Sequence, residues 1–446
     1  EAIQPPPSEA LQVAFTADGL HALGVPSTVI DGFSDEFRAG MAEASRARQL
    51  GDQGPNAPSA WRWGGTDAET PHLAVLFFAE SERFESFLAA AKGPGWSAAF
   101  TEVTTLETNG VGTSEPFGFA DGVSQPQLDW EQQRDVTWPQ YQYSNVVALG
   151  EFLLGYPNEY GKLTPRPLLE STPSTAHLSA AADAPDRKDL GLNGSYLVIR
   201  QLEQDVRKFW QFVYGESNGD LAAADLLASQ MVGRNRSGTL LVPLQAEPIP
   251  GVPPAQAAHN NFTYRDDPAG SRCPFGAHVR RANPRTADFP RPLGFFGKIL
   301  SLIGLGPSEF QDDLVSPVRY HRLLRRGRKY GPDLEPAAAR QLPAPNEPER
   351  GLVFVALNAN LSRQFEFVQN AWIRYSKFDG LSGETDPLLG NRLPIPGCPV
   401  TSDFTIPAEN SLGRRVTDVP QLVTVRGGAY FFLPSLRALK YIARAE

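Results

Sequence analysis

Residues 272–285 combine one histidine with several arginines in a stretch of otherwise small and apolar side chains. A neutral imidazole is a good ligand for haem iron, and a planar guanidinium can donate paired hydrogen bonds to a haem propionate. We therefore interpret His278 as a candidate axial ligand and Arg280 as a cofactor contact. The alternative is an ordinary structural histidine, because the chain has six and a histidine alone is not specific for metal.

A second candidate is the carboxylate of Asp121, which lies between glycines in residues 115–126. Gly118 and Gly122 permit backbone conformations and close approaches that larger residues forbid. A carboxylate held in such a turn can act as a general acid and base. The alternative is an Asx turn, in which the side chain only bonds its own backbone.

Residues 320–331 are strongly basic, and several of their charges suit a solvated surface. Two leucines precede Arg325, which is typical of a strand that enters the core. We therefore expect the Arg325 side chain to point inward, where a guanidinium can stabilise negative charge that develops during a reaction.

The composition limits the class of protein. The chain has 446 residues, 41% apolar side chains and a net charge of −9, which favours a two-domain globular protein and disfavours a nucleic-acid partner. No run of about twenty apolar residues predicts a transmembrane segment. Cys273 and Cys398 could form one disulfide or remain two buried thiols. We expect a soluble protein, either cytoplasmic or secreted after removal of a leader.

The hydrophobic pattern predicts an α+β fold of two ferredoxin-like domains, with antiparallel sheets flanked by helices. In the first half, strands are expected at residues 11–16, 72–79 and 100–104, and helices at 35–48 and 81–88. In the second half, strands are expected at 195–200, 351–357, 422–425 and 430–432, and helices at 206–213 and 361–375. We place the domains at residues 1–115 and 191–446, joined by residues 116–190, which hold the Asp121 turn and an irregular connection.

Taken in order, these stretches resemble the dye-decolourising peroxidases, a family of haem peroxidases with two ferredoxin-like domains. The similar segments are the signature turn Gly118-Phe119-Ala120-Asp121-Gly122, the proximal stretch 276–285, the distal strand 324–327, and residues 364–369 and 386–390. The resemblance covers most of the chain. The long loops make it more similar to the larger bacterial and fungal members than to the compact ones.

The resemblance implies that haem b (iron protoporphyrin IX) binds in the C-terminal domain with His278 as the iron ligand. It implies that Asp121 is the distal acid and base and that Arg325 stabilises charge, with an acidic pH optimum. Asp386 is the candidate carboxylate for the second ring nitrogen of His278, although a helix or turn cap would look the same in the sequence.

Further positions follow from the same resemblance. Leu352 and Phe354 match apolar residues that restrict the distal pocket, and they would look the same as ordinary core residues. Tyr330 and Trp372 match positions that relay electrons from bulky substrates in some relatives, although most such rings only pack. An insertion at residues 289–315 matches no motif of the family, and a loop folded onto its own domain is the favoured interpretation.

The expected function is a haem peroxidase that reduces hydrogen peroxide and oxidises bulky aromatic compounds such as dyes and phenols. The alternative is a haem carrier or iron-release protein with incidental peroxidase activity. Asp121 with Arg325 favours the enzyme, because a carrier needs no acid and base on the open face of its cofactor. A third interpretation is an α+β scaffold without any cofactor.

Overall fold

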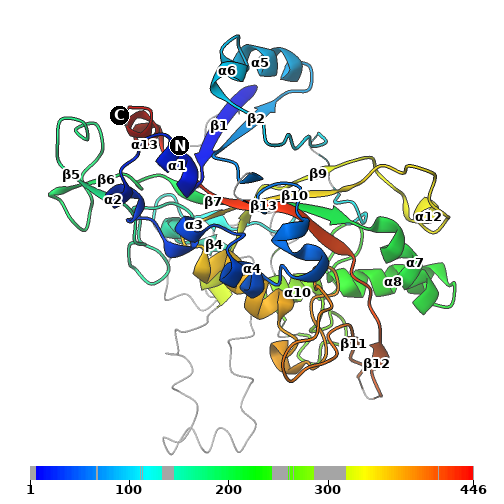
Figure 1. Cartoon of the computed structure of the whole chain (residues 1–446). Coiled ribbons are helices and arrows are strands. Elements are labelled where there is room, and N and C mark those ends of the chain that lie inside the picture. Colours follow the sequence, from blue (N-terminus) through cyan, green and yellow to red (C-terminus); the bar gives the residue numbers. More distant parts are fainter. Residues whose placement is uncertain are drawn as a thin grey trace, which may run out of the picture.

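A seven-stranded antiparallel sheet runs through the centre of the fold, in the order β2-β1-β13-β7-β10-β8 with β9 also paired to β10 (Figure 1). The computed structural model describes residues 7–66, 69–110, 112, 114–132, 145–243, 260, 262–264, 266–285, 318–409 and 411–444. Strands β7 and β13 lie at the centre of this sheet, and both consist mostly of buried residues. Cover on both faces of the sheet explains why most residues of these strands are buried, polar ones such as Arg200 included.

The strands of this sheet are β1 (Glu9–Phe15), β2 (Leu73–Ala79), β7 (Ser195–Gln204), β8 (Leu324–Arg325), β9 (Arg328–Tyr330), β10 (Gly351–Asn358) and β13 (Val423–Leu433). Three small pairs accompany it: β3 (Gln127–Leu128) with β4 (Val146–Val147), β5 (Leu168–Glu170) with β6 (Arg187–Asp189), and β11 (Phe404–Ile406) with β12 (Arg414–Val416).

The α-helices are α1 (Ala17–Ala22), α2 (Ser27–Ile30), α3 (Asp35–Ala39), α4 (Ala44–Leu50), α5 (Phe84–Ala91), α6 (Trp96–Ala99), α7 (Val206–Glu216), α8 (Leu221–Val232), α10 (His278–Ala282), α12 (Pro336–Ala339) and α13 (Leu436–Ile442). The 3-10 turns are η1 (Gly54–Asn56), η2 (Pro58–Ala60), η5 (Leu149–Glu151), η7 (Val318–His321) and η10 (Phe378–Gly380). Two π-helical segments are η8 (Ser362–Glu366) and η9 (Val368–Arg374). No helix in these described ranges is long and apolar enough to cross a membrane.

Most of the predicted elements form, and two predictions were wrong. The helix expected at 35–48 is divided into α3 and α4, because Gly40 ends α3 at a φ of 79° and Glu43 caps α4. Residues 101–109 form no strand and are mostly exposed, so the strand expected at 100–104 is absent. Phe100, Val103 and the threonines beside them favour a strand, but no strand in the described ranges pairs with this segment.

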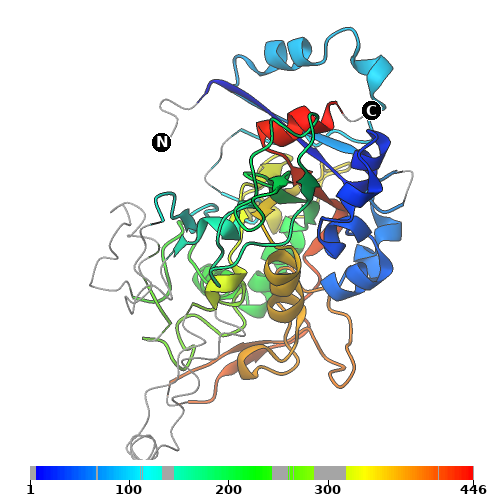
Figure 2. The same cartoon turned by 90° about the vertical axis from the view of Figure 1, so that its left-hand side faces the viewer.

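Strands β1 and β2 form a ribbon that leaves the main sheet. They pair with each other over seven positions, whereas β1 reaches β13 only through Phe15 and Phe432. Helices α5 and α6 lie at the outer end of this ribbon in both views (Figures 1 and 2). The domain boundaries at residues 115 and 191 stay a prediction.

The two faces of β10 carry different side chains, because residues alternate along a strand. Leu352, Phe354 and Ala356 share one face, and Arg325 lies opposite Ala356 on that face. Tyr330 lies opposite Gly351 and therefore on the other face, where it packs with the cluster around Trp63. Only the first face can contribute to a site that contains Arg325.

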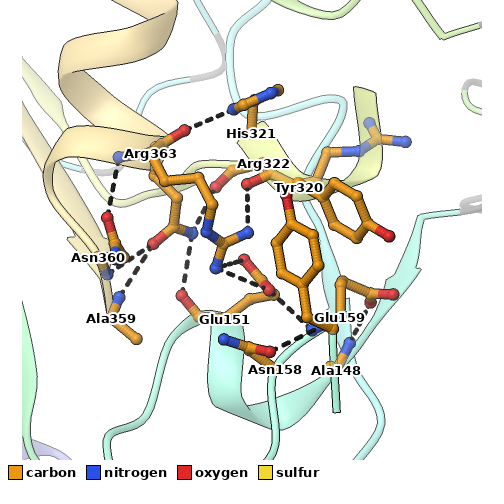
Figure 3. A network of polar contacts seen from close by, with 12 residues as sticks. Ala148, Glu151, Asn158, Glu159, Tyr320, His321, Arg322, Ala359, Asn360 and Arg363 are labelled. Carbon is orange, nitrogen blue, oxygen red and sulfur yellow. Dashed lines mark hydrogen bonds and ion pairs between the residues drawn. The ribbon is translucent and has the colours of Figure 1, made fainter. Parts of the chain in front are cut away.

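A buried ion pair connects the turn η5 to the π-helical segment (Figure 3). Glu151 is fully buried, and its carboxylate lies 2.8 Å from Nη2 of Arg363. The amide of Gln364 donates to the carbonyl oxygens of Glu151 and Arg322. Arg363 also donates to the carbonyl of Tyr320, so this network fixes the residues that lead into β8 and Arg325.

Candidate active site

His278 is the first residue of α10, and its ring lies next to a buried carboxylate. Nδ1 of His278 is 2.8 Å from Oδ2 of Asp386, which has no exposed surface. This is the pair named from the resemblance, and the two residues are 108 positions apart in the chain. The other ring nitrogen, Nε2, has no hydrogen-bond partner within the described ranges, and 28% of the side chain is exposed.

The charges around this pair are strongly coupled. Burial opposes protonation of His278, but the Asp386 carboxylate outweighs it and raises the pKa of the imidazole above its usual value. Burial also favours the neutral form of Asp386, yet His278 and the backbone N–H of Leu389 hold the pKa of this carboxyl below its usual range. Asp386 is therefore a carboxylate, and it accepts the Nδ1 proton. In the neutral imidazole, that assignment leaves the lone pair on Nε2.

Asp121 lies at the exposed end of its glycine turn. Gly118 and Gly122 have φ values of 96° and 72°, which explains why this turn needs glycine at both positions. The carboxylate accepts one backbone hydrogen bond, from the N–H of Gly122 at 2.6 Å. This bond reaches only the next residue, whereas an Asx turn needs a bond to the N–H two positions on, so the structure does not show the Asx-turn contact at Asp121.

Glu115 anchors the backbone of the Asp121 turn through hydrogen bonds. Its carboxylate accepts from the backbone N–H groups of Phe117 and Phe119, each at 2.9 Å, and from the side-chain amide of Gln204 at 2.8 Å. Burial raises the pKa of Glu115 to about 6. The sequence reasoning missed this residue, and its only signal was a carboxylate placed just before the glycine turn.

Arg325 contacts the segment that follows Asp121. Its backbone N–H donates to Oε1 of Gln125 at 3.0 Å, and Nη2 donates to the carbonyl of Ser124 at 3.4 Å. The positive charge of Arg325 also opposes protonation of His278. The structure thus brings the Asp121 loop, Arg325 and His278 into one electrostatic environment, although they come from three distant parts of the chain.

The apolar residues predicted for the pocket belong to the main core cluster. Leu352 and Phe354 are partly buried and pack against it, as do Val279, which follows His278, and Leu389, which follows the Asp386 turn. A cavity of about 50 Å³ lies beside Phe354 and Leu389, next to the buried ion pair of Asp52 and Arg200. It suits a few water molecules and is too small for a porphyrin.

Arg280 and Arg285 have different surroundings. Arg280 lies between the rings of Tyr264 and Phe275 and forms an ion pair with Asp267 at 3.2 Å. Arg285 is 2% exposed, and within the described ranges its guanidinium donates to neutral groups alone: the carbonyls of Asn260 and Phe262 and the hydroxyl of Ser124. Burial lowers the pKa of Arg285 to about 9. It is therefore a buried cation without a carboxylate partner in the part of the chain that is described.

The two residues predicted as electron relays are both partly or fully inside the protein. The hydroxyl of Tyr330 donates to Glu349 at 2.7 Å, on the sheet face away from Arg325. Trp372 is 9% exposed, meets the ring of His321 edge-on at 5.2 Å, and accepts a hydrogen bond from Arg281 through its carbonyl. A bulky molecule would have little direct access to Trp372.

These residues fit a haem better than a metal ion bound only by side chains. An accessible imidazole nitrogen faces no protein donor, and Arg285 supplies a buried positive charge that suits a propionate. No group of three or more His, Cys, Asp or Glu within the described ranges could hold a bare metal ion. Cys273 and Cys398 are both buried free thiols. The insertion expected at residues 289–315 lies outside the described residues, and the described part of the chain resumes at Val318.

Comparison with known proteins supports the same interpretation. The search found no family model that matches the chain. The chain is 30% identical over 96% of its length to a multifunctional dye peroxidase of Amycolatopsis sp., of which it covers 81%. It is 28% identical over 97% of its length to a dye-decolorizing peroxidase of Auricularia auricula-judae, of which it covers 75%. A solved structure of a dye-decolorizing peroxidase with 2,6-dimethoxyphenol covers 100% of this chain and 88% of its own, with a TM-score of 0.67 and 24% identity. These similarities confirm the predicted resemblance and the predicted α+β, ferredoxin-like fold class.

Proposed function

The chain belongs to the dye-decolorizing peroxidase family, and on this premise we propose that it reduces hydrogen peroxide with haem b and oxidises bulky dyes and phenols by one-electron steps. The single observation that carries the proposal is the hydrogen bond between His278 and the buried carboxylate of Asp386. Metal-binding histidines characteristically donate their second ring N–H to such a carboxylate, which fixes the tautomer and makes the ligand more basic. When bound, haem would supply the iron centre that reduces peroxide and that accepts the electrons of the substrate.

On the proximal side, Nε2 of His278 would bind the iron. Asp386 keeps the ring proton on Nδ1, so the lone pair stays on Nε2. Arg285, the buried cation without a carboxylate partner in the described ranges, is our candidate for a propionate contact. Arg280, named from the sequence for that role, would have to leave Asp267 to reach a propionate, and we propose it only as a support of the same wall.

On the distal side, Asp121 would take a proton from one peroxide oxygen and return it to the other as the O–O bond breaks. General acid and base catalysis of this kind contributes about a hundred- to ten-thousand-fold. Arg325 would stabilise the negative charge that develops on the departing oxygen. Leu352 and Phe354 would narrow the distal pocket, so that it admits peroxide and excludes a dye.

Substrates too large for the pocket would give their electrons at the protein surface. We propose Trp372 as one relay and Tyr330 as another, on the resemblance alone. The placement of Tyr330 on the opposite sheet face makes it the weaker candidate, because electrons from it would have to cross the sheet. Trp372→Phe should slow oxidation of an anthraquinone dye while the reaction with peroxide keeps its rate.

The test is an absorbance experiment on the haem-loaded protein. It should have a ferric Soret band that changes rapidly on adding peroxide and returns when 2,6-dimethoxyphenol is supplied. Asp121→Asn should slow the peroxide step by at least about a hundredfold with haem retained. The exposed Asp186→Asn is the matched control and should react as the parent does. A protein that hands its haem to apomyoglobin within a few turnovers would instead be a carrier.

A further inference from the structure

We propose that Arg392 is a positioning residue for Asp386, and through Asp386 for His278. The inference rests on the proposed haem site and concerns how the proximal hydrogen bond is held. Arg392 was not among the residues named from the sequence, although it braces the turn that holds Asp386. This turn, residues 384–392, presents the Asp386 carboxylate to the imidazole.

The guanidinium of Arg392 binds three consecutive residues of this turn. Nη1 donates to Oγ1 of Thr385 and to the carbonyl of Asp386, each at 2.9 Å, and Nη2 donates to the carbonyl of Pro387 at 2.6 Å. Its Nε donates to the carbonyl of Pro420 at 3.3 Å, which ties the turn to the segment before β13. A lysine has one compact donor group and cannot reproduce this fork.

Gly390 provides the space that Arg392 needs. A Cβ at this position would lie 2.2 Å from Oγ1 of Thr385, 2.5 Å from Nη1 of Arg392 and 2.6 Å from the carbonyl oxygen of Asp386. Arg392 itself has a φ of 58°, a left-handed conformation that is unfavourable for a non-glycine residue. The chain accepts this conformation at the residue whose side chain must turn back onto Asp386.

The Asp386 carboxylate divides its two oxygens between the turn and the ligand. Oδ1 accepts from the backbone N–H groups of Leu388 and Leu389, each at 2.9 Å, and Oδ2 faces His278. The backbone N–H of Asp386 donates to the carbonyl of Ile373 at 2.8 Å. The direction of Oδ2 is therefore set by the backbone of residues 386–389, and Arg392 holds the carbonyl side of that backbone.

Charge and geometry make opposite predictions for the loss of Arg392. If its positive charge were the important property, removing that charge would leave Asp386 a stronger acceptor and the imidazole more basic. If its fork is the important property, the turn shifts, the bond to Nδ1 weakens and the imidazole becomes less basic. We assign the second role, so Arg392→Lys, which keeps the charge, should still weaken the bond.

The experiment uses the haem-loaded protein and two test variants that disturb the fork in different ways. Arg392→Lys removes the fork and keeps the charge, whereas Gly390→Ala crowds the guanidinium, Oγ1 of Thr385 and the carbonyl of Asp386 without changing the charge. Arg392→Met, which removes the charge as well, is the comparison. The measurements are the iron–histidine stretching band of the ferrous protein by resonance Raman spectroscopy and the rate of haem transfer to apomyoglobin. Asp386→Asn defines complete loss of the bond, and Arg340→Lys, which lies over Tyr214, is the control.

Both test variants should move the stretching band to lower frequency, part of the way to its position in Asp386→Asn, and speed haem transfer about tenfold. Bands that stay at the parent position in both folded variants would overturn the role of Arg392. A shift to higher frequency in Arg392→Met, with none in Arg392→Lys, would show that only the charge matters and would also overturn it. A parent protein without an iron–histidine band would instead refute the proposed haem ligand.

Discussion

Replacing Asp386 with asparagine should reverse the tautomer of His278. Oδ1 accepts two backbone N–H groups, so the amide oxygen of asparagine must take that place. The amide NH2 then faces Nδ1 of His278, which lies 2.8 Å from the present Oδ2. Two N–H donors cannot share this contact, so the ring proton moves to Nε2, the nitrogen proposed to bind iron.

The size of the effect follows from the bond that is lost. A hydrogen bond to a charged group contributes about 1.5–3 kcal/mol, and the burial of Asp386 places this one toward the upper end. To bind iron, the variant must also return to the less favourable tautomer. We therefore expect haem affinity to fall about 10- to 100-fold, equivalent to about 1.4–2.7 kcal/mol.

Haem transfer to apomyoglobin measures this loss directly. The rate of transfer should rise in Asp386→Asn by the same factor of about 10 to 100. Asp403→Asn is the matched control, because Asp403 is also a buried carboxylate but pairs with Arg415. An Asp386→Asn protein that retained its haem as firmly as the control would refute the tautomer argument.

Two predictions concern stability. Arg363→Met should lower the free energy of unfolding by about 3–5 kcal/mol, because it leaves the Glu151 carboxylate buried without its partner, and adding Glu151→Gln should recover part of that loss in chemical denaturation. Burial lowers the pKa of His321 to about 4 from an ordinary 6.5, so the folded chain holds it neutral. The free energy of unfolding contains the full contribution of neutral His321 above pH 6.5. About 3 kcal/mol of it is lost as the pH falls toward 4, because the unfolded chain then binds the proton more readily. His321→Phe should remove this part of the acid sensitivity. Denaturation curves give the free energy of unfolding at pH 7 and pH 4.5, and an equal difference between the two pH values in parent and variant would contradict the prediction.

The sequence was most informative where structure is local. Strands β7, β10 and β13 were predicted because a short apolar run bounded by polar turns is typical of a buried strand. The same reasoning failed at residues 100–104, where aromatic and β-branched residues favoured a strand but no strand in the described ranges pairs with the segment. Strand formation depends on a partner that the segment itself does not specify.

Sequence motifs identified candidate residues of the site, but they did not predict most of the contacts between them. The pairing of His278 with Asp386 spans 108 positions, and no periodicity connects them, so only the family resemblance suggested it. Glu115 and Gln204 meet beneath the Asp121 turn because β7 ends there, which no local pattern encodes. These contacts become visible once the strands are placed.

Arg280 and Arg285, two of the arginines that follow His278, show why residue type alone cannot assign a role. Arg280 is two positions after the histidine and turns toward Asp267, so its charge is already neutralised. Arg285 lies beyond the end of α10 at a φ of 56°, which returns its side chain to the ring of Phe262 at 3.8 Å. Among the described residues its guanidinium meets neutral acceptors alone, and a buried guanidinium in such surroundings is costly unless an anion joins it. The resemblance drew attention to the stretch, but the electrostatic imbalance at Arg285 is what favours this residue over Arg280 as the contact for a propionate.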